Sequence, residues 1–405
     1  MPSHSPMTTQ QVVSSPIPLL TSAVDVALDT ALSEQRLIGA VVLIAVDGQI
    51  RYARAAGWAD RETRRAMNRD ALFRLASISK LIVSTAAMVR IAQDRLDLDA
   101  PIQRLLPEFR PMLADGSRPD ISARQLLSHT AGLGYRFLDP APDGDGPHAR
   151  VGVSDGMDDS PVSLAENLRR IAQVPLQYAP GTAWGYSLAT DVLGALLEAV
   201  DGQPLPTVVE TAVTGPLSMR DTAFHALDPA RLATAYAAAD GATPPHRLQE
   251  DEIASPFPGL AGIRFSPSRA LDPHAFPSGG GGMVGSADDL MRLLEALRRA
   301  RVPSLSAGWI AEMGRVQSGP HGPPDSPGVG FGLGFSILHD PAAAASPESI
   351  GTWRWGGAYG HSWFVDPSRR LSVVALTNTL YEGMSGAFVT ELRDAIYAGL
   401  QGAEA

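Results

Sequence analysis

Strand-forming segments at both ends of the chain, with mainly helical segments between them, constrain the fold more than any other feature. Near the N-terminus, an apolar run at residues 41–46 and a second strand-like run at 50–53 flank Asp47-Gly48. An Asp-Gly pair between two such runs is a strong β-hairpin signal. Residues 362–365 and 371–376 predict a second hairpin near the C-terminus. We therefore expect an α+β fold, with one antiparallel sheet built from both chain ends, flanked by helices, and a helical region inserted between them.

Apolar residues that recur with helical spacing predict helices at residues 23–35, 165–173, 188–200 and 287–297. A closing helix would carry Phe388, Leu392, Ala395 and Ile396 on one face.

Long stretches rich in Pro, Gly and Asp predict loops that shape a site, and they lie at about residues 136–160, 237–282 and 315–328. We expect residues 1–95 and 285–405 to form an α/β domain, and residues 96–284 to form a mainly helical domain with long loops.

The charge and composition of the 405 residues exclude several classes of protein. A formal net charge of −10 argues against nucleic acid or an anionic membrane as a partner. The absence of cysteine excludes disulfides, a thiol nucleophile and cysteine-ligated metal sites. Residues 1–20 lack Lys, Arg and a continuous apolar stretch, so they do not predict a signal peptide, and no segment is long enough to span a membrane. We therefore expect a soluble cytoplasmic protein.

Lys80 is the only lysine among the 33 basic residues, and it lies three residues after Ser77. Arginine can replace lysine in salt bridges, but it cannot release a proton near neutral pH, whereas a buried lysine can. The apolar run at residues 81–92 predicts a buried helix with both residues at its first turn, on one face. We therefore interpret Ser77 as a candidate nucleophile and Lys80 as its acid–base partner. The alternative is a helix cap beside a solvated lysine.

Tyr186 is a third candidate, because it stands between a Pro-Gly turn and a predicted helix. A tyrosine at such a junction can point into a cleft, and a phenolate near an ammonium can serve as a general base. The alternative is an ordinary half-buried tyrosine that packs against Trp184.

Two glycines in Trp355-Gly356-Gly357-Ala358, at the edge of a predicted strand, mark a place where a ligand or another backbone comes close. A substrate carbonyl at that edge could accept hydrogen bonds from the N–H groups of Ala358 and Ser77, which would form an oxyanion hole. His361 follows closely and is a candidate for lining the same site. We expect His129 to be a structural histidine.

These segments together resemble the serine β-lactamase and penicillin-binding protein superfamily, whose signature is S-x-x-K, a Tyr- or Ser-led motif, and K-T-G on a strand. Within it, the chain is most similar to the family VIII carboxylesterases of the EstB type, which are relatives of class C β-lactamases. The resemblance runs from about residue 22 to the C-terminus and rests on residues 73–80, 126–134, 186–188, 277–280, 283 and 355–357.

The resemblance implies a serine β-lactamase-like fold and an acyl-enzyme on Ser77, with Lys80 and Tyr186 as the proton-transfer pair. Two residues depart from the lactamase pattern, because Leu188 replaces an asparagine and Trp355 replaces the lysine of K-T-G. Both lost groups would bind a β-lactam, so the departures favour hydrolysis of short-chain, uncharged carboxylic esters and weak or no β-lactamase activity. The expected substrate pocket comprises Leu188, Trp355, Gly356, Gly357 and His361.

Other functions for the same residues stay open. Acyl transfer to an alcohol would differ only in the second nucleophile. Action on penicillins or D-amino-acid peptides is a further alternative. A non-catalytic scaffold is the least favoured, because such scaffolds commonly lose the Ser, Lys or Tyr that are all present here.

Other motifs in the sequence are weaker. Gly152-Val153-Ser154-Asp155-Gly156 matches the G-x-S-x-G nucleophile elbow, but it follows a loop instead of a strand. The glycines at 279–282 lack the Lys-Ser/Thr of a phosphate loop, and the nine histidines show no metal spacing. We expect no cofactor, no metal and a small-molecule ester as the partner, and the sequence does not set the oligomeric state.

Overall fold

The computed structural model describes residues 9–10, 16–140, 145–238 and 244–404. Within them, nine strands form one sheet in the order β1-β3-β2-β15-β14-β13-β12-β11, with β4 paired to β3. The strands are β1 Thr9–Gln10, β2 Gly39–Val46, β3 Gln49–Asp60, β4 Arg65–Ala66, β11 Val329–Phe331, β12 Ser336–Leu338, β13 Trp353–Gly357, β14 His361–Asp366 and β15 Leu371–Thr377.

The two chain ends meet in the middle of this sheet, where β2 and β15 run antiparallel. Ile44 lies opposite Val373, and Val42 lies opposite Ala375. The predicted α+β class, with an antiparallel sheet built from both ends, is therefore confirmed. The predicted domain limits stay a prediction, and one cluster of buried residues extends from the sheet into the helical region.

The hairpin between β2 and β3 has the turn that its sequence predicts. Asp47 has a φ of 55° and Gly48 a φ of 79°. Two successive residues in the left-handed region form the turn whose twist matches that of the flanking strands, and Asp-Gly is well suited to it.

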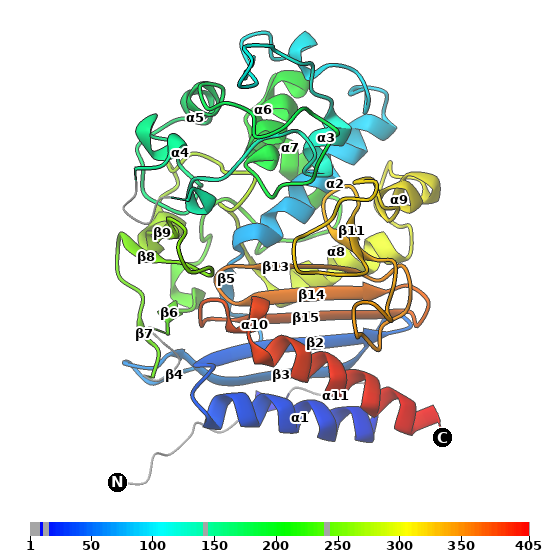
Figure 1. Cartoon of the computed structure of the whole chain (residues 1–405). Coiled ribbons are helices and arrows are strands. Elements are labelled where there is room, and N and C mark those ends of the chain that lie inside the picture. Colours follow the sequence, from blue (N-terminus) through cyan, green and yellow to red (C-terminus); the bar gives the residue numbers. More distant parts are fainter. Residues whose placement is uncertain (1–8, 11–15, 141–144, 239–243, 405) are drawn as a thin grey trace.

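Two terminal helices cover one face of the sheet: α1 (Pro18–Ser33) and α11 (Ala387–Glu404) lie side by side beneath β2 and β3 in Figure 1. Leu28 of α1 and Ile396 of α11 share a buried apolar cluster with Ile44 of β2. Helix α1 starts earlier than predicted because Pro18 occupies the first turn, where its missing N–H has no cost.

The opposite face carries α8, and α3, α5, α6 and α7 stack beyond α2, whereas α10 packs against β14 and α11 (Figure 1). The predicted helices at 165–173, 188–200 and 287–297 correspond to α5, α6 and α8. The helices are α2 Ser79–Ala92, α3 Ala123–Leu127, α4 Pro147–Arg150, α5 Leu164–Ile171, α6 Ala189–Asp201, α7 Leu205–Val209, α8 Ala287–Arg298, α9 Ala307–Met313 and α10 Glu382–Ser385.

The predicted loops hold short strands that pair locally: β5 Leu72–Arg74 with β10 Val284–Ser286, β6 Tyr236–Ala237 with β7 His246–Arg247, and β8 Glu252–Ala254 with β9 Ile263–Phe265. Residues 141–144 and 239–243 of these loops, and residues 1–8 and 11–15 of the predicted N-terminal segment, lie outside the described residues. Among the helices of the described residues, none is long and apolar enough to cross a membrane.

Candidate active site

Ser77 lies in a single 3₁₀ turn (Ala76–Ile78) that leads directly into α2. Every residue of α2 from Ser79 to Ile91 is buried, because this helix passes through the interior between the sheet and the helical region. Ala76 has a φ of 47°, which costs energy for a residue with a Cβ. The surrounding packing therefore holds a strained backbone immediately before Ser77, which itself is partly exposed.

Lys80 is 1% exposed, and its side-chain nitrogen points back to the serine. Nζ donates to Ser77 Oγ at 3.2 Å and to the carbonyl oxygen of Gly280 at 2.7 Å. It also lies 4.7 Å from the ring centroid of Tyr186 and 5.3 Å from that of Tyr135. The groups in direct contact with Nζ are therefore two oxygens and two aromatic faces, with no carboxylate among them in the described residues.

The Tyr186 hydroxyl completes the group by donating to Ser77 Oγ at 2.5 Å. Its ring is fixed by Tyr135 and His129, each at 5.0 Å between centroids, and by Trp355 at 5.4 Å. The three residues predicted as catalytic thus converge on one oxygen atom. An alcohol that contacts both an amine and a phenol can pass its proton to one of these two groups, while the other group supplies a proton.

His129 packs beneath Tyr186 without touching Ser77, as expected for a structural histidine. Its Nδ1 lies 3.1 Å from Ser187 Oγ, and its carbonyl oxygen accepts from Gly185 N–H at 2.9 Å. Burial, with the charge of Lys80, holds the pKa of His129 well below its usual range. The imidazole is therefore neutral and holds the segment that carries Tyr186.

The end of β13 lies directly against the turn that carries Ser77. A Cβ at Gly357 would lie 2.4 Å from the Leu75 carbonyl oxygen and 3.5 Å from Ala76 Cβ. Only glycine allows this approach, and Ala358 is the next residue along the chain. At Gly356, a Cβ would lie 2.8 Å from Met384 Cγ, so the second predicted glycine is also required by close packing.

The structure places His361 elsewhere than predicted. Its imidazole is 1% exposed, Nε2 donates to the Arg74 carbonyl at 2.8 Å, and Nδ1 accepts from Thr377 N–H at 3.1 Å. Burial lowers the pKa of His361 to about 4. Both ring nitrogens are therefore engaged, and His361 ties β14 to the strand before Ser77 instead of lining a pocket.

Leu188 also differs from its predicted place in the pocket, because it has no exposed surface and belongs to the main core. It occupies the cap position of α6, and its N–H donates to the Gly134 carbonyl at 3.0 Å. Trp355 is half-buried and packs on Tyr186 and, at 5.1 Å between centroids, on Phe331. Of the two departures from the lactamase pattern, Trp355 is the one beside the candidate catalytic residues.

Gly280 and Tyr135 both contact Lys80, and neither was predicted to belong to the site. Gly280 lies in the segment 277–280 that supports the family resemblance, and Tyr135 directly follows the segment 126–134. Their approach to Lys80 depends on tertiary packing, so only their proximity to recognised motifs could have indicated them.

Ser154 of the G-x-S-x-G motif has no exposed surface, and its Oγ donates to Asp158 Oδ1 at 2.6 Å. It lies in no strand-to-helix turn and makes no contact with the candidate catalytic residues. Its hydroxyl therefore has a structural role. Within the described residues, no group of three or more His, Asp and Glu side chains is placed to hold a metal ion.

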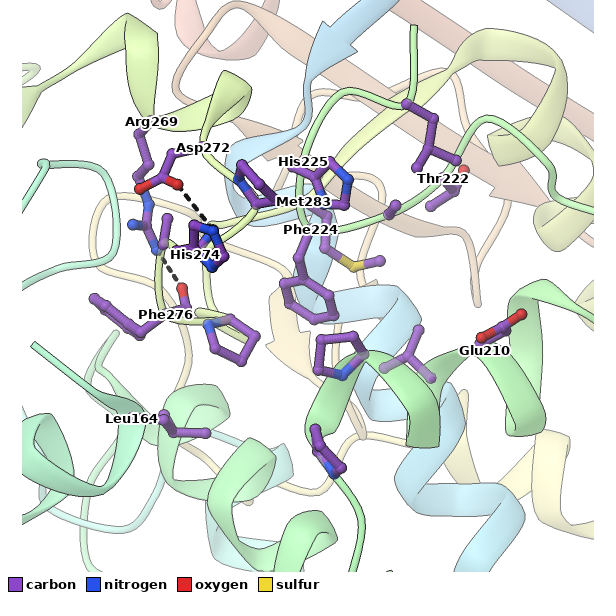
Figure 2. A pocket seen from close by; sticks show the side chains of 18 of the residues that line it. Leu164, Glu210, Thr222, Phe224, His225, Arg269, Asp272, His274, Phe276 and Met283 are labelled. Atoms are coloured by element: carbon purple, nitrogen blue, oxygen red, sulfur yellow. Dashed lines mark hydrogen bonds between the residues drawn. The ribbon is translucent and has the colours of Figure 1, made fainter.

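A separate cavity of about 1370 Å³ is shown in Figure 2, where Phe224, His274 and Phe276 line it. None of the three candidate catalytic residues belongs to its described lining. Met283 separates the two regions, because its side chain lines the cavity while its backbone N–H donates to Ser79 Oγ at 3.1 Å. The cavity therefore lies behind the segment that carries the serine.

The chain is similar to known proteins over most of its length. A family model described as beta-lactamase matches residues 24–398. Esterase EstB of Burkholderia gladioli is 49% identical over 381 residues, which cover 94% of this chain and 95% of the relative.

Solved structures of similar fold cover nearly the whole chain. EstCE1, described as a hydrolase with promiscuous acyltransferase activity, is 47% identical, with a TM-score of 0.90 over 94% of this chain and 99% of its own. The LovD6 mutant of simvastatin synthase from Aspergillus terreus is 22% identical, with a TM-score of 0.74 over 97% and 100% of the two chains. The latter likeness concerns the fold alone.

Proposed function

The chain belongs to the beta-lactamase family and is a serine hydrolase, and from this premise we propose that it is a carboxylesterase that hydrolyses short-chain esters through an acyl-enzyme on Ser77. The observation that carries the proposal is the convergence of Lys80 Nζ and Tyr186 OH on Ser77 Oγ, at 3.2 and 2.5 Å. The similarity to Esterase EstB supports an ester as the substrate.

In the acylation step, Ser77 Oγ attacks the ester carbonyl carbon and its proton passes to the Lys80–Tyr186 pair. The tetrahedral intermediate collapses, the bond to the alcohol oxygen breaks, and the pair returns a proton to the leaving alkoxide. Water then attacks the acyl-enzyme, giving its proton to the same pair, and Ser77 leaves as the alcohol with that proton restored. The pair ends each turnover in its starting state.

The Tyr186 hydroxyl can be tested by Tyr186→Phe, which removes one oxygen and leaves the ring contacts. We expect kcat/KM for a nitrophenyl ester to fall by at least about 10²-fold, the lower scale for general acid–base groups. Tyr178→Phe is the matched control, because the Tyr178 hydroxyl donates to the His129 carbonyl at 3.2 Å and does not contact Ser77. Equal activities of the two variants would exclude a proton-transfer role for Tyr186.

The oxyanion hole that we propose, from the N–H groups of Ser77 and Ala358, depends on how closely β13 approaches the serine turn. In Gly357→Ala, the new Cβ would meet a backbone oxygen at 2.4 Å, so the strand must move away. We expect kcat to fall by about 10²-fold, the scale for losing one oxyanion donor. Gly308→Ala is the control, because only Ser306 Oγ lies near its Cβ position, at 3.7 Å. Full activity of Gly357→Ala would contradict the assignment.

Trp355 is the basis for the proposed substrate class. An indole offers a substrate carboxylate no ion pair, so a β-lactam anion beside it would lose hydration without a positive charge to compensate. Short uncharged esters have no such cost. We expect kcat/KM for nitrophenyl acetate or butyrate to exceed that for a penicillin by at least about 10³-fold. Penicillin hydrolysis as fast as that of the best ester would replace the esterase assignment with a lactamase.

Acyl transfer to an alcohol is a second candidate, because the printed description of EstCE1, 47% identical to this chain, includes promiscuous acyltransferase activity. The acyl-enzyme would be the same, with an alcohol in place of water. Adding a small alcohol to the ester assay and measuring the ratio of new ester to free acid distinguishes the two. A ratio that stays near zero at rising alcohol concentration would exclude transfer.

A further inference from the structure

A carboxylate lies buried behind the glycine run that contacts Lys80. Asp191 stands in the first turn of α6, five residues after Tyr186, and is 1% exposed. Its Oδ1 accepts from Ser278 Oγ at 2.6 Å. Its Oδ2 is buried and has no hydrogen-bond donor of ordinary geometry among the described residues. A buried carboxylate with one incompletely solvated oxygen costs stability unless a positive charge lies nearby.

Gly280 lies against both this carboxylate and Lys80. Its carbonyl oxygen accepts from Lys80 Nζ at 2.7 Å, whereas a Cβ on its α-carbon would lie 2.4 Å from Asp191 Oδ2. Any other residue at this position would push the loop away from one of the two charged groups. The absence of a side chain at Gly280 therefore lets Asp191 and Lys80 both pack against the same residue.

The electrostatic surroundings leave Lys80 as a principal counter-charge of Asp191. Burial raises the pKa of Asp191, while the Ser278 hydroxyl, the charge of Lys80, the Gly280 N–H and the charge of Arg269 oppose that rise. The second cation, Arg269, donates to the Gly156 and Phe276 carbonyls and lies at the edge of the cavity in Figure 2. The other titratable groups that face Lys80, Asp191 or their neighbours are His129, Tyr135, Asp155 and Tyr186.

Two of these neighbours carry no charge. Burial raises the pKa of Tyr135 well above its usual range, and burial with the Lys80 charge holds that of His129 well below. Asp155 accepts hydrogen bonds from the N–H groups of Arg136 and Phe137, both at 2.9 Å. These bonds hold its carboxyl group against the backbone of those two residues.

We propose that Asp191 is a positioning residue whose carboxylate, acting across Gly280, stabilises the ammonium that Lys80 becomes when it takes the Ser77 proton. This inference rests on the proposed function, because it assigns that proton to the Lys80–Tyr186 pair. No bond forms or breaks at Asp191, which remains ionised throughout. An opposite charge within a few ångströms favours the charged form of a group, most strongly where water is excluded.

Asp191→Asn tests the proposal, because the amide keeps the shape and the acceptor for Ser278 but removes the charge. Without the carboxylate, Lys80 should release its proton at a pH lower by at least about one unit. The acid limb of the pH profile of kcat/KM should move to lower pH by the same amount. The plateau should fall by about tenfold, because a weaker base accepts the serine proton less readily. A merely structural role would lower the plateau and leave the limb in place.

The titration of Lys80 can be observed directly, since a protein grown with ¹³Cε-labelled lysine contains one labelled side chain. NMR titrations would compare the wild type with Asp191→Asn and with Asp289→Asn. Asp289 is a matched control, because its buried carboxylate accepts from Thr222 Oγ1 at 2.9 Å and from Asp221 N–H at 2.7 Å without contacting Lys80. We expect a lower midpoint in Asp191→Asn and an unchanged midpoint in Asp289→Asn.

Equal midpoints in all three proteins would overturn the proposal. If Asp191→Asn does not fold, the NMR titration of the wild type tests the proposal. Protonation of Asp191 at acidic pH should give the Lys80 signal a second inflection. The absence of that inflection would overturn the role of Asp191. Labelling of Ser77 with a fluorophosphonate tests the proposed function separately. If Ser77 is not labelled, the proposed acyl-enzyme is wrong. If Ser77 is labelled but the titration midpoint of Lys80 does not shift in Asp191→Asn, only the role of Asp191 is wrong.

Discussion

Ser77→Ala is expected to abolish ester hydrolysis while the protein stays folded. Removal of one member of a catalytic unit typically lowers the rate by about 10³- to 10⁶-fold. Ser77 is partly exposed, and among the described residues its Oγ takes part in hydrogen bonds from Lys80 and Tyr186 only, so little stability depends on it. The measurement is kcat/KM for a nitrophenyl acetate, with circular dichroism and thermal unfolding to verify the fold.

Ser154→Ala is the natural control, because Ser154 belongs to the competing G-x-S-x-G motif. Its hydroxyl donates to Asp158 and accepts from Gly156 N–H, and its loss should reduce stability by about 1–3 kcal/mol without removing activity. An inactive Ser154 variant beside an active Ser77 variant would contradict both the mechanism and the assignment of the motifs.

Lys80→Arg is expected to lose acylation almost completely, to about the same extent as Lys80→Ala. Arginine keeps the positive charge, but its guanidinium cannot lose a proton in a protein. It therefore cannot accept the serine proton. The Lys80 side-chain nitrogen is also enclosed by Gly280, Ser77 and two aromatic rings, which leaves little room for a larger guanidinium.

Pre-steady-state acylation rates of the two lysine variants, measured beside the wild type, test this expectation. The alanine variant reports the loss of both charge and proton acceptor, whereas the arginine variant restores the charge alone. If the arginine variant recovers a large share of the wild-type rate, Lys80 supplies only charge, and another group must accept the serine proton.

The parts of the fold that depend on local sequence could be predicted. The β2–β3 hairpin follows from Asp47-Gly48, because that pair suits a turn with two positive φ values. The pairing of β2 with β15 followed less directly, from strand patterns at both ends with helices between them. The start of α1 was predicted too late, because apolar periodicity does not register the first turn, where Pro18 stands.

The candidate site was predictable where spacing alone brings residues together. Ser77 and Lys80 are three residues apart, and their contact follows from the helical turn between them. His361 and Leu188 are buried instead of lining the pocket, because the direction of a side chain at a strand or helix end depends on tertiary packing. Gly280 and Asp191 meet Lys80 through the packing of distant segments, which no local pattern encodes.

The most direct test of the central claim is to identify the acylated residue by mass spectrometry. A slowly hydrolysed nitrophenyl ester would be mixed with the protein, quenched in acid and digested with trypsin. Cleavage after Arg74 and Lys80 releases the peptide Leu75-Ala76-Ser77-Ile78-Ser79-Lys80. The acyl group should be on Ser77 of this peptide, and it should be absent from the Ser77→Ala protein. An acyl group on Ser154 or on any other residue, with Ser77 unmodified throughout turnover, would contradict the account.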